Sequence, residues 1–468
     1  MRLEKCIAII GGGIAGLTAA YYLQKEINEK NLPYKVKLIE ASKQLGGKIQ
    51  TTQKNGFTIE RGPDSFLIRK QSAARLVKEV GLEDQLVKNG TGNSYILVNN
   101  KLHKMPSGSF MGIPTQVRPF LFSSIFSLKG KLRASYDFVL PKGKAVQDQS
   151  LGMFFRRRFG DELVENLVEP LLSGIYAGDI DDLSLMATFP NFYELEQKHG
   201  SLVKGLQRTM PKKKKTKGPK PSMFYSLRNG LQTLTDTIEE KLEEGTVIKG
   251  VPVDHIEKKQ GHYHLLLGNG EVCKADSVVL ATPFYTTQRM LSQYDFMDQL
   301  KEMKATSVAN VALAFDASAI KKDIDGTGFV VSRNSDYRIT ACTWTHKKWP
   351  ESTAPEGKAL LRCYLGKPGD EAVVDLSDEE IVEIVLRDLN KTMNITDKPE
   401  FSVITRWKNA MPQYSVGHKQ RIEAVKSSLK EELPGVFLAG GSYSGIGIPD
   451  CIDQGEAAVK NVLSYLNK

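Results

Sequence analysis

The stretch Cys6-Ile-Ala-Ile-Ile-Gly-Gly-Gly-Ile-Ala-Gly16 decides the fold of this chain. Residues 6–10 are apolar and rich in isoleucine, as in a buried parallel strand. Gly11, Gly13 and Gly16 follow with the spacing G-x-G-x-x-G, and a helical pattern begins at once. Such glycines allow a tight turn, close approach of a pyrophosphate and close helix–strand packing. The stretch predicts a dinucleotide-binding unit, and a purely structural glycine-rich turn is the alternative.

The residues after this unit extend the nucleotide-binding pattern. A second predicted strand, residues 35–39, ends at Glu40, where a carboxylate that binds a ribose is expected. The loop ASKQLGGK (41–48) follows it. The helix that begins after the glycine turn directs free N–H groups and its positive dipole end at a bound phosphate.

Composition places the chain among ordinary globular proteins. Its 468 residues are enough for two or three domains, with 41% hydrophobic and 25% charged residues. The net charge is +10, and six of the positive charges are lysines within 212–220. That stretch has no apolar periodicity and predicts a solvated loop, with a contact to anionic lipid or nucleic acid as the alternative. No aromatic residues alternate with these lysines, which argues against nucleic acid.

Cysteine usage and hydropathy favour a cytoplasmic protein. The five cysteines are widely spaced and form no C-x-x-C pair, which argues against a disulfide framework or a zinc site. His262 and His264 share a strand face, but no third ligand is visible, so no metal is expected. No signal peptide precedes the first strand. The apolar run 119–128 is far shorter than the roughly 20 residues of a spanning helix, which leaves only a peripheral membrane contact open.

Several longer stretches resemble one enzyme family. The E-A-x(3)-L-G-G-K pattern at 40–48 resembles FAD-dependent amine oxidases, carotene desaturases and porphyrinogen oxidases. A closer match to the porphyrinogen oxidases covers almost the whole chain: ERGPDSF (60–66), NLVEPLLSGIYAGD (166–179), SLRNGLQTL (226–234), TSVANVALAF (306–315), RWKNAMPQYSVGHKQRI (406–422) and GGSYSGIGIPDCIDQGEAAV (440–459). The chain looks most like the soluble Gram-positive type that acts on coproporphyrinogen III. The lysine loop at 212–220 departs from typical members.

The resemblance implies an α/β fold with a discontinuous, Rossmann-like FAD-binding domain. We expect this domain to comprise residues 1–90, 225–290 and 400–468. A mixed-sheet substrate domain would comprise 291–399 with parts of 91–104. A helical insertion, 105–224, would carry the lysine-rich loop 211–221 and is a candidate to face a membrane.

The resemblance also implies a reaction in haem biosynthesis. Coproporphyrinogen III would be oxidised to coproporphyrin III by three hydride transfers to the flavin, with molecular oxygen reduced to hydrogen peroxide. No side chain is assigned a catalytic role, because the flavin ring accepts the hydride. A ferrochelatase would be a pathway partner.

Cofactor and substrate residues carry over by family position. The predicted cofactor contacts are Gly11, Gly12, Gly13, Ile14, Ala15, Gly16, Glu40, Ala41, Lys48, Gly62, Pro63, Asp64, Ser65, Val253, Trp407, Ile446, Gly447 and Ile448. The predicted substrate contacts are Arg69, Lys70, Gly174, Ile175, Tyr176, Phe329 and Val330. The last predicted helix would direct its positive end at the flavin, where negative charge develops on reduction.

Four alternatives to this function remain open. Protoporphyrinogen IX could be the preferred substrate. An amine oxidase often holds its flavin through a cysteine, and only Cys451 lies in the matching region. A carotene desaturase would share the N-terminus but not the MPQY–GH segment. A non-catalytic binding protein, such as a Rab GDP-dissociation inhibitor, would have lost the residues that hold FAD.

Overall fold

The computed structural model describes residues 4–90, 93–106, 108–209 and 222–467. The predicted lysine loop at 212–220 lies outside the described residues. The chain divides into two compact units. Unit 1 comprises Met1–Lys88, Met223–Lys304 and Lys419–Lys468, and unit 2 comprises Asn89–Ser222 and Ala305–His418. Residues 291–304 therefore belong to unit 1, whereas residues 400–418 and the helical region after 105 belong to unit 2.

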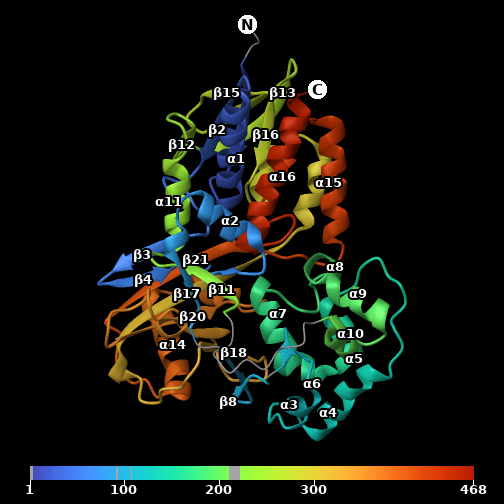
Figure 1. The fold of residues 1–468 in the computed structure, drawn as a ribbon, viewed down its shortest axis with the longest axis vertical. Coiled ribbons are helices and arrows are strands. Elements are labelled where there is room, and N and C mark those ends of the chain that lie inside the picture. Colours follow the sequence, from blue (N-terminus) through green and yellow to red (C-terminus); the bar gives the residue numbers. More distant parts are fainter. Residues whose placement is uncertain (1–3, 91–92, 107, 210–221, 468) are drawn as a thin grey trace. The chain divides into compact units, whose positions relative to one another are not determined.

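A five-stranded parallel sheet forms the centre of unit 1. Its strand order is β12-β2-β1-β16-β22. The strands are β1 (Lys5–Ile10), β2 (Tyr34–Glu40), β12 (Val247–Lys249), β16 (Ser277–Leu280) and β22 (Val436–Leu438). Three chain segments that are far apart in sequence therefore share one sheet (Figure 1). The predicted N-terminal strand lies at the middle of it.

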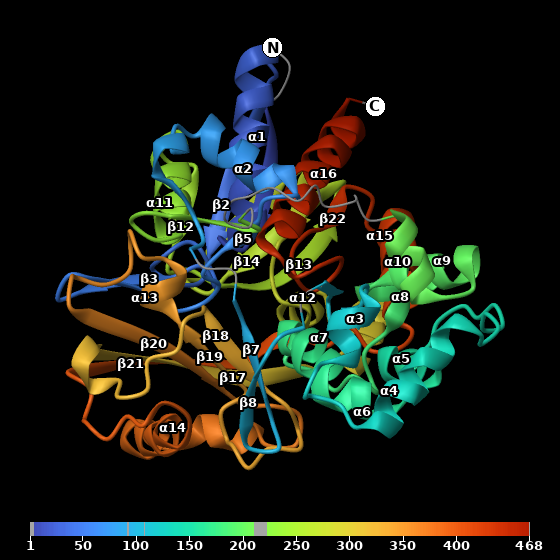
Figure 2. The ribbon, with the colours of Figure 1, turned by 60° about the horizontal axis from the view of Figure 1, so that its bottom comes forward.

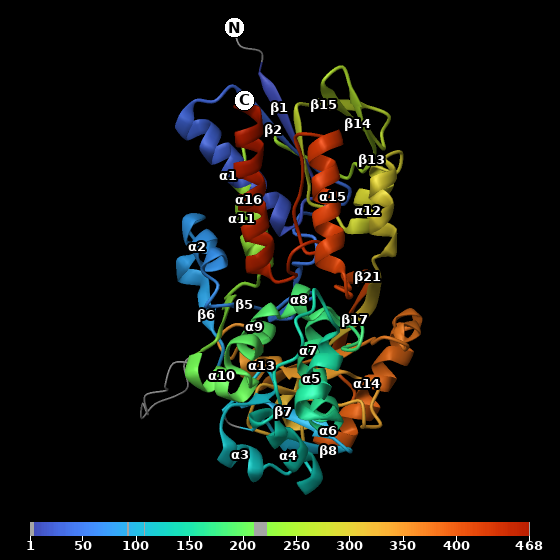
Figure 3. The same cartoon turned by 90° about the vertical axis from the view of Figure 1, so that its right-hand side faces the viewer.

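Helices pack on this sheet through one hydrophobic core. The helices are α1 (Ile14–Lys30), α2 (Gln71–Glu79), α11 (Gln232–Glu240) and α16 (Ile448–Leu466). The first and last of them, α1 and α16, lie side by side (Figures 1 and 3). A Cβ at Gly455 of α16 would lie 2.6 Å from the carbonyl oxygen of Ala15, so the close approach of these helices requires glycine.

Smaller elements complete unit 1. Asn269 and Gly270 form the turn that joins β14 to β15 in an antiparallel sheet, and an Asn-Gly pair is typical of such a turn. The remaining strands are β3 (Thr51–Lys54), β4 (Phe57–Glu60), β5 (Phe66–Leu67), β6 (Leu86–Lys88), β11 (Phe224–Leu227), β13 (Val253–Lys259), β14 (His262–Leu267) and β15 (Val272–Ala275). The remaining helices are η1 (Glu83–Gln85), α12 (Phe284–Met290), η4 (Asp295–Glu302) and α15 (His418–Glu432), whose first residue belongs to unit 2.

Unit 2 contains a seven-stranded mixed sheet in the order β21-β17-β20-β19-β18-β7-β8. Its strands are β7 (Tyr95–Val98), β8 (Lys101–Lys104), β17 (Ala305–Asp316), β18 (Gly328–Val331), β19 (Ala341–Trp344), β20 (Lys358–Leu365) and β21 (Phe401–Pro412). Helix α14 (Asp378–Met393) packs on one face through a core that includes Leu361, Cys363 and Val385 (Figure 2). A capping box formed by Ser377 and Glu380 starts this helix.

The predicted helical insertion is largely helical but begins with a β-hairpin. Strands β9 (Ser109–Phe110) and β10 (Ile113–Pro114) pair across Met111 and Gly112, which both have positive φ and so break the helical pattern. The helices that follow are α3 (Val117–Leu121), α4 (Leu128–Ser135), η2 (Tyr136–Phe138), α5 (Leu151–Phe159), α6 (Asp161–Leu163), η3 (Val164–Val168), α7 (Glu169–Tyr176), α8 (Leu185–Thr188), α9 (Pro190–His199) and α10 (Leu202–Thr209). Three short helical elements lie within the sheet connections: η5 (Ala317–Ala319), α13 (Thr345–Lys348) and η6 (Glu371–Asp375).

A buried ion-pair network joins these helices. Arg158 of α5 and its partners Asp137 and Glu196 have fully buried side chains. The Arg158 Nε donates to Asp137 Oδ1 at 2.6 Å, and its Nη1 donates to Glu196 Oε1 at 3.2 Å. Asp137 in turn accepts the backbone N–H of Val203 at 3.0 Å, in the first turn of α10. Each charge is thus paired and hydrogen-bonded, as burial requires.

Within the described ranges, no helix combines the length and the apolar character needed to cross a membrane.

Candidate functional site

The glycine turn connects β1 to α1 at the carboxyl end of the parallel sheet. Gly11 has a φ of +105°, and a Cβ there would lie 2.7 Å from the carbonyl oxygen of Ala281. A Cβ at Gly16 would lie 1.9 Å from the Gly11 carbonyl oxygen, so helix and turn are in direct contact. A Cβ at Gly13, by contrast, would meet no atom within 4 Å. Gly11 and Gly16 are therefore required by packing, whereas the space at Gly13 is open to a ligand.

Glu40 and the loop behind it close the turn. The Gly12 N–H donates to Glu40 Oε2 at 2.6 Å, and the Ser42 N–H donates to Glu40 Oε1 at 2.8 Å. The Gly46 N–H donates to the Gly12 carbonyl oxygen at 2.8 Å. The ribose-binding carboxylate predicted from sequence thus lies against the glycine turn. Ser42, which was not predicted as a site residue, holds the carboxylate there, and Gly46 holds the loop against the turn.

Lys48 ends this loop and is exposed to solvent. Its side chain retains contact with solvent, yet desolvation by the surrounding protein lowers its pKa. A cation that is accessible to solvent but enclosed by protein is suited to an anionic ligand. Ala41 is also exposed, and Val253 is buried at the start of β13.

The C-terminal segment meets the same turn. A Cβ at Gly440 would lie 3.8 Å from Ala15 Cβ, which places the end of β22 beside the first turn of α1. Gly447 is the N-cap of α16, and Ile448 is its first residue. Ile446, just before the cap, is half-buried. Segments from both ends of unit 1 therefore converge at one end of its sheet, as the sequence predicts.

Lys70, the residue that precedes α2, lies in the same region, beside the start of α16. The Lys70 ammonium pairs with the Asp450 carboxylate, in the first turn of that helix. Arg69, beside it, is exposed. The partner Asp450 was not predicted as a site residue. The signal in the sequence was its position, shortly after the predicted cofactor contacts Gly447 and Ile448.

The loop at 60–65 is held by Glu60 rather than by its predicted members. Glu60 is buried, and its Oε1 accepts the Leu231 N–H at 2.6 Å, just before α11. Its Oε2 accepts the Thr51 hydroxyl at 2.9 Å. Glu60 therefore has a structural role and keeps the predicted contacts in place. Those contacts, Gly62, Pro63, Asp64 and Ser65, are all half-buried in unit 1.

Six of the predicted residues belong to unit 2. Trp407 lies on β21 opposite Val308, and Gly174 and Ile175 are exposed near the end of α7. Tyr176 is buried, with its ring 5.4 Å from that of Tyr414. Tyr176 therefore has a packing role, whereas Gly174 and Ile175 are accessible to a ligand.

The two predicted residues of β18 point to opposite faces of the sheet. Phe329 is buried in the core beneath α14, with its ring 6.3 Å from Trp344. Because side chains alternate along a strand, Val330 faces the other way. Phe329 therefore has a packing role. Because both residues are apolar, the sequence does not show which of them faces the core.

The MPQY–GH motif has a structural role within unit 2. The Gln413 Nε2 donates to the Tyr176 carbonyl oxygen at 2.9 Å and to Thr306 Oγ1 at 3.0 Å. The Tyr414 and His418 rings stack at 4.0 Å. The motif thus fixes the end of α7 to the strands beside it.

Cys451 does not present a reactive thiol. Burial, followed by the charge of Asp450, raises its pKa to about 12, so the thiol stays protonated at neutral pH. A covalent bond to a flavin needs a nucleophilic thiolate. This residue gives no support to the amine-oxidase alternative.

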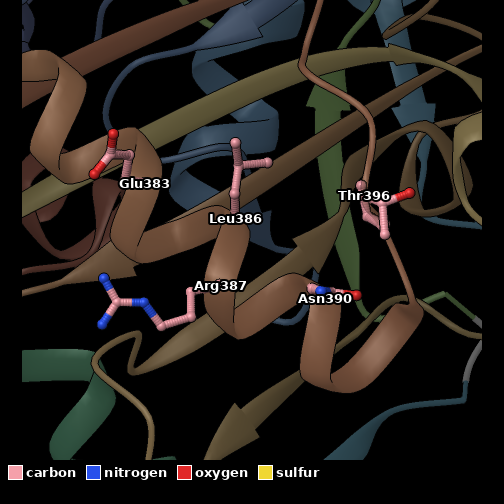
Figure 4. A pocket seen from close by; sticks show the side chains of 6 residues that line it. Glu383, Leu386, Arg387, Asn390 and Thr396 are labelled. Carbon is pink, nitrogen blue, oxygen red and sulfur yellow. The ribbon is translucent and has the colours of Figure 1, made fainter.

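An open pocket elsewhere on unit 2 contains none of the predicted residues. It lies along α14 and the loop after it, and is lined by Glu383, Leu386, Arg387, Asn390, Ile395 and Thr396 (Figure 4). Most of these side chains are exposed and their charges are mixed. Among the described residues, no group of His, Cys, Asp and Glu suited to a metal ion is found.

Comparison with known proteins agrees with this geometry. Residues 14–463 match the family of flavin containing amine oxidoreductases. The chain is 56% identical to the coproporphyrinogen III oxidase of Bacillus subtilis, with 99% of each chain covered. It is 44% identical to the enzyme of that name from Staphylococcus aureus, over 99% of this chain and 100% of the relative.

Solved structures give the same answer for the fold. A crystal structure from Exiguobacterium sp. 255-15, assigned as a protoporphyrinogen oxidase, has a TM-score of 0.88 and 37% identity, with 99% of both chains covered. Flavin is the cofactor of the family, and the glycine turn, Glu40 and the start of α16 are suited to FAD. The chain therefore belongs to the flavin containing amine oxidoreductases, and within them to the group of the coproporphyrinogen III oxidases.

Proposed function

We propose that this protein oxidises coproporphyrinogen III to coproporphyrin III with FAD and molecular oxygen. The observation that carries the cofactor part is the convergence of the glycine turn and the start of α16 at one end of the sheet in unit 1. The substrate follows from the 56% identity to a protein named for that reaction. FAD supplies a hydride acceptor for the bridging carbons of the macrocycle and passes the electrons to oxygen, which leaves as hydrogen peroxide.

The residues of unit 1 have separate tasks in this reaction. The open space at Gly13 and the N–H groups of the first turn of α1 receive the pyrophosphate. Glu40 exchanges its bond with Gly12 for the ribose hydroxyls. The N-terminal end of α16, at Gly447 and Ile448, favours negative charge near the redox-active ring.

Lys70 would bind a substrate carboxylate at the same end of α16. Its pairing with Asp450 restrains the ammonium on the protein before substrate arrives. The four propionates of coproporphyrinogen provide partners, whereas protoporphyrinogen IX has vinyl groups in place of two of them. A hydrogen bond from the Lys70 ammonium to a propionate contributes about 1.5–3 kcal/mol once bound substrate excludes solvent, which corresponds to roughly tenfold or more in binding.

Turnover of two porphyrinogens in air tests the substrate. We expect purified holoenzyme to oxidise coproporphyrinogen III with a kcat/KM at least about tenfold above that for protoporphyrinogen IX. Porphyrin fluorescence measures the product, and an oxygen electrode with a peroxidase assay measures the electrons. Three peroxides should form for each porphyrin. Equal rates on the two substrates, or a yellow protein that turns over neither, would contradict the proposal.

We further propose a peripheral contact between unit 2 and an anionic lipid surface. Apolar side chains are exposed on α3, α4 and the segments beside them, above all Phe122 (86%), Leu128 (80%) and Val139 (76%). The exposed cations Arg118 and Lys129 lie in the same segments. Apolar residues next to cations suit the interface of an anionic membrane.

Vesicle sedimentation tests this contact. The protein should bind vesicles that contain phosphatidylserine more strongly than vesicles of phosphatidylcholine alone. The double variant Phe122→Ser, Leu128→Ser should lower the bound fraction several-fold, since it removes two exposed apolar side chains. Met223→Ser, at another exposed apolar residue, in unit 1 (61%), is the control and should bind as the parent does. Equal binding by parent and double variant would refute the assignment.

The product would pass to a ferrochelatase. This proposal rests on the chemistry of the product, because a free porphyrin is the substrate of metal insertion. Co-purification of the two proteins, with and without coproporphyrin III, tests it, and no association in either case would exclude a direct complex.

A further inference from the structure

Two cysteines far apart in sequence lie together in unit 1. Cys6 is in β1, and Cys273 is in β15. The Asp276 N–H donates to the Cys6 carbonyl oxygen at 2.7 Å, and the Cys6 N–H donates to Asp276 Oδ2 at 2.7 Å. These bonds fix the end of β15 beside the start of β1 (Figure 3). Both cysteines are half-buried, so solvent reaches them.

The two thiols have different electrostatic surroundings. The Cys6 thiol is the main cause that lowers the pKa of Cys273 to about 7, and the Cys273 thiol is the main cause that raises the pKa of Cys6. The Asp276 carboxylate raises the pKa of Cys6 further, and the Lys37 ammonium lowers that of Cys273. Cys273 is therefore the more readily ionised of the two, and the thiolate is the nucleophilic form of a cysteine.

The other cysteines lack this combination. Cys342 and Cys363 face each other across β19 and β20, but both are fully buried. Burial raises the pKa of Cys363 well above its usual range, and that of Cys451 is also raised. Protonated and shielded thiols react slowly with oxidants. Cys6 and Cys273 are therefore distinguished by access as well as by contact.

We propose that Cys6 and Cys273 form a peroxide-responsive dithiol, in which Cys273 is the nucleophile and Cys6 the resolving thiol. The Cys273 thiolate attacks one oxygen of hydrogen peroxide, the O–O bond breaks, and hydroxide leaves a sulfenic acid on Cys273. The Cys6 sulfur then attacks the Cys273 sulfur, so that an S–S bond forms and water leaves. Overall, two thiols are oxidised to a disulfide and one peroxide is reduced to two waters. The proposed oxidase reaction would be one source of this peroxide. Only this source, and not the chemistry of the two cysteines, rests on the proposed function.

Thiol counting after peroxide treatment tests the pair. Reduced, desalted holoprotein is treated at pH 7 with a small excess of hydrogen peroxide, then unfolded and titrated. The count should fall from five thiols to three, and a tryptic digest should contain one peptide that links Cys6 to Cys273. Five remaining thiols, or a loss that maps to other cysteines, would overturn the proposal. Because the peroxide is added, the result does not depend on porphyrinogen turnover.

Single variants assign the two roles. In Cys6→Ala, dimedone should trap a sulfenic acid on Cys273 and no disulfide should form. The alkylation rate of Cys273 at pH 7 should also fall about tenfold, since the thiol that lowers its pKa is gone. In Cys273→Ala, peroxide should leave all remaining thiols free. A sulfenic acid that appears on Cys6 instead would reverse the assignment and so contradict it.

Two lysine variants test whether the charge of Lys37, and not simply any nearby positive charge, makes Cys273 reactive. Lys37→Gln should shift the pH midpoint of Cys273 alkylation upward, because Lys37 stabilises the thiolate. Lys35→Gln removes the same charge from an exposed position on the same strand and should leave the midpoint unchanged. Equal midpoints in all three proteins would refute the electrostatic role of Lys37.

Discussion

Replacement of Gly13 by valine is expected to give a folded protein that has lost its flavin. The backbone at Gly13 has φ −72° and ψ 174°, which any residue adopts, and a Cβ there meets no protein atom within 4 Å. The substitution therefore costs the fold little. A bound pyrophosphate must approach this backbone closely, and a valine side chain occupies that space. We expect FAD affinity to fall at least about 100-fold, or roughly 3 kcal/mol.

Two neighbours provide the controls. Gly16→Val should fail to fold, because its Cβ would lie 1.9 Å from the Gly11 carbonyl oxygen. Glu40→Gln keeps the shape of the side chain but loses its charge, so it should bind FAD more weakly than the parent and more tightly than Gly13→Val. Flavin absorbance per protein and a thermal unfolding curve measure the two properties separately. A yellow Gly13→Val protein, or one that unfolds like Gly16→Val, would contradict the assigned site.

The second large effect is expected at Arg158, in the helical part of unit 2. Arg158→Ala removes the cation from between Asp137 and Glu196, whose side chains are both fully buried. Breaking a buried pair from one side leaves an uncompensated charge and costs about 3–5 kcal/mol of unfolding free energy. For a unit of this size the thermal midpoint should fall by about 10 °C, as measured by circular dichroism. FAD content should be retained in the folded protein, because Arg158 is not among the predicted cofactor contacts and all of these except Trp407 lie in unit 1.

Arg157 is the matched control, since it carries the same charge on the same helix. Its Nη2 pairs with Glu196 Oε1 at 2.8 Å, but its own side chain is 36% exposed. Arg157→Ala should therefore lower the unfolding free energy by no more than about 1 kcal/mol. Similar midpoints for the two variants would show that burial does not determine the contribution of the network.

Local sequence patterns predicted the core of unit 1. The apolar run of β1, the glycine spacing and the helix that follows need only neighbouring residues, and the structure has them at Lys5–Ile10 and Ile14–Lys30. The turn at Asn269-Gly270 is equally local. Family likeness added the C-terminal segment, which the structure places beside Ala15.

Features that depend on tertiary contacts could not be predicted from the sequence. Phe329 and Val330 look alike in an apolar run, and only the position of α14 decides which one is buried. The partner of Glu60, the Leu231 N–H, lies 171 positions away in the sequence. The pairing of Lys70 with Asp450 spans 380 positions, and no spacing rule covers such a distance. The assignment of these residues to FAD and substrate stays a prediction.

The strand order of unit 1 has a consequence for synthesis on the ribosome. β1 lies between β2, which is close to it in sequence, and β16, while the edge strand β22 and helix α16 are made far later. A nascent chain that has not reached Val436 lacks both, so the apolar flank of α1 that packs on α16 stays uncovered until these residues are synthesised. A truncation that removes only β22 and α16 should therefore be far more damaging than the few residues lost suggest, and such chains are expected substrates for chaperones and proteases.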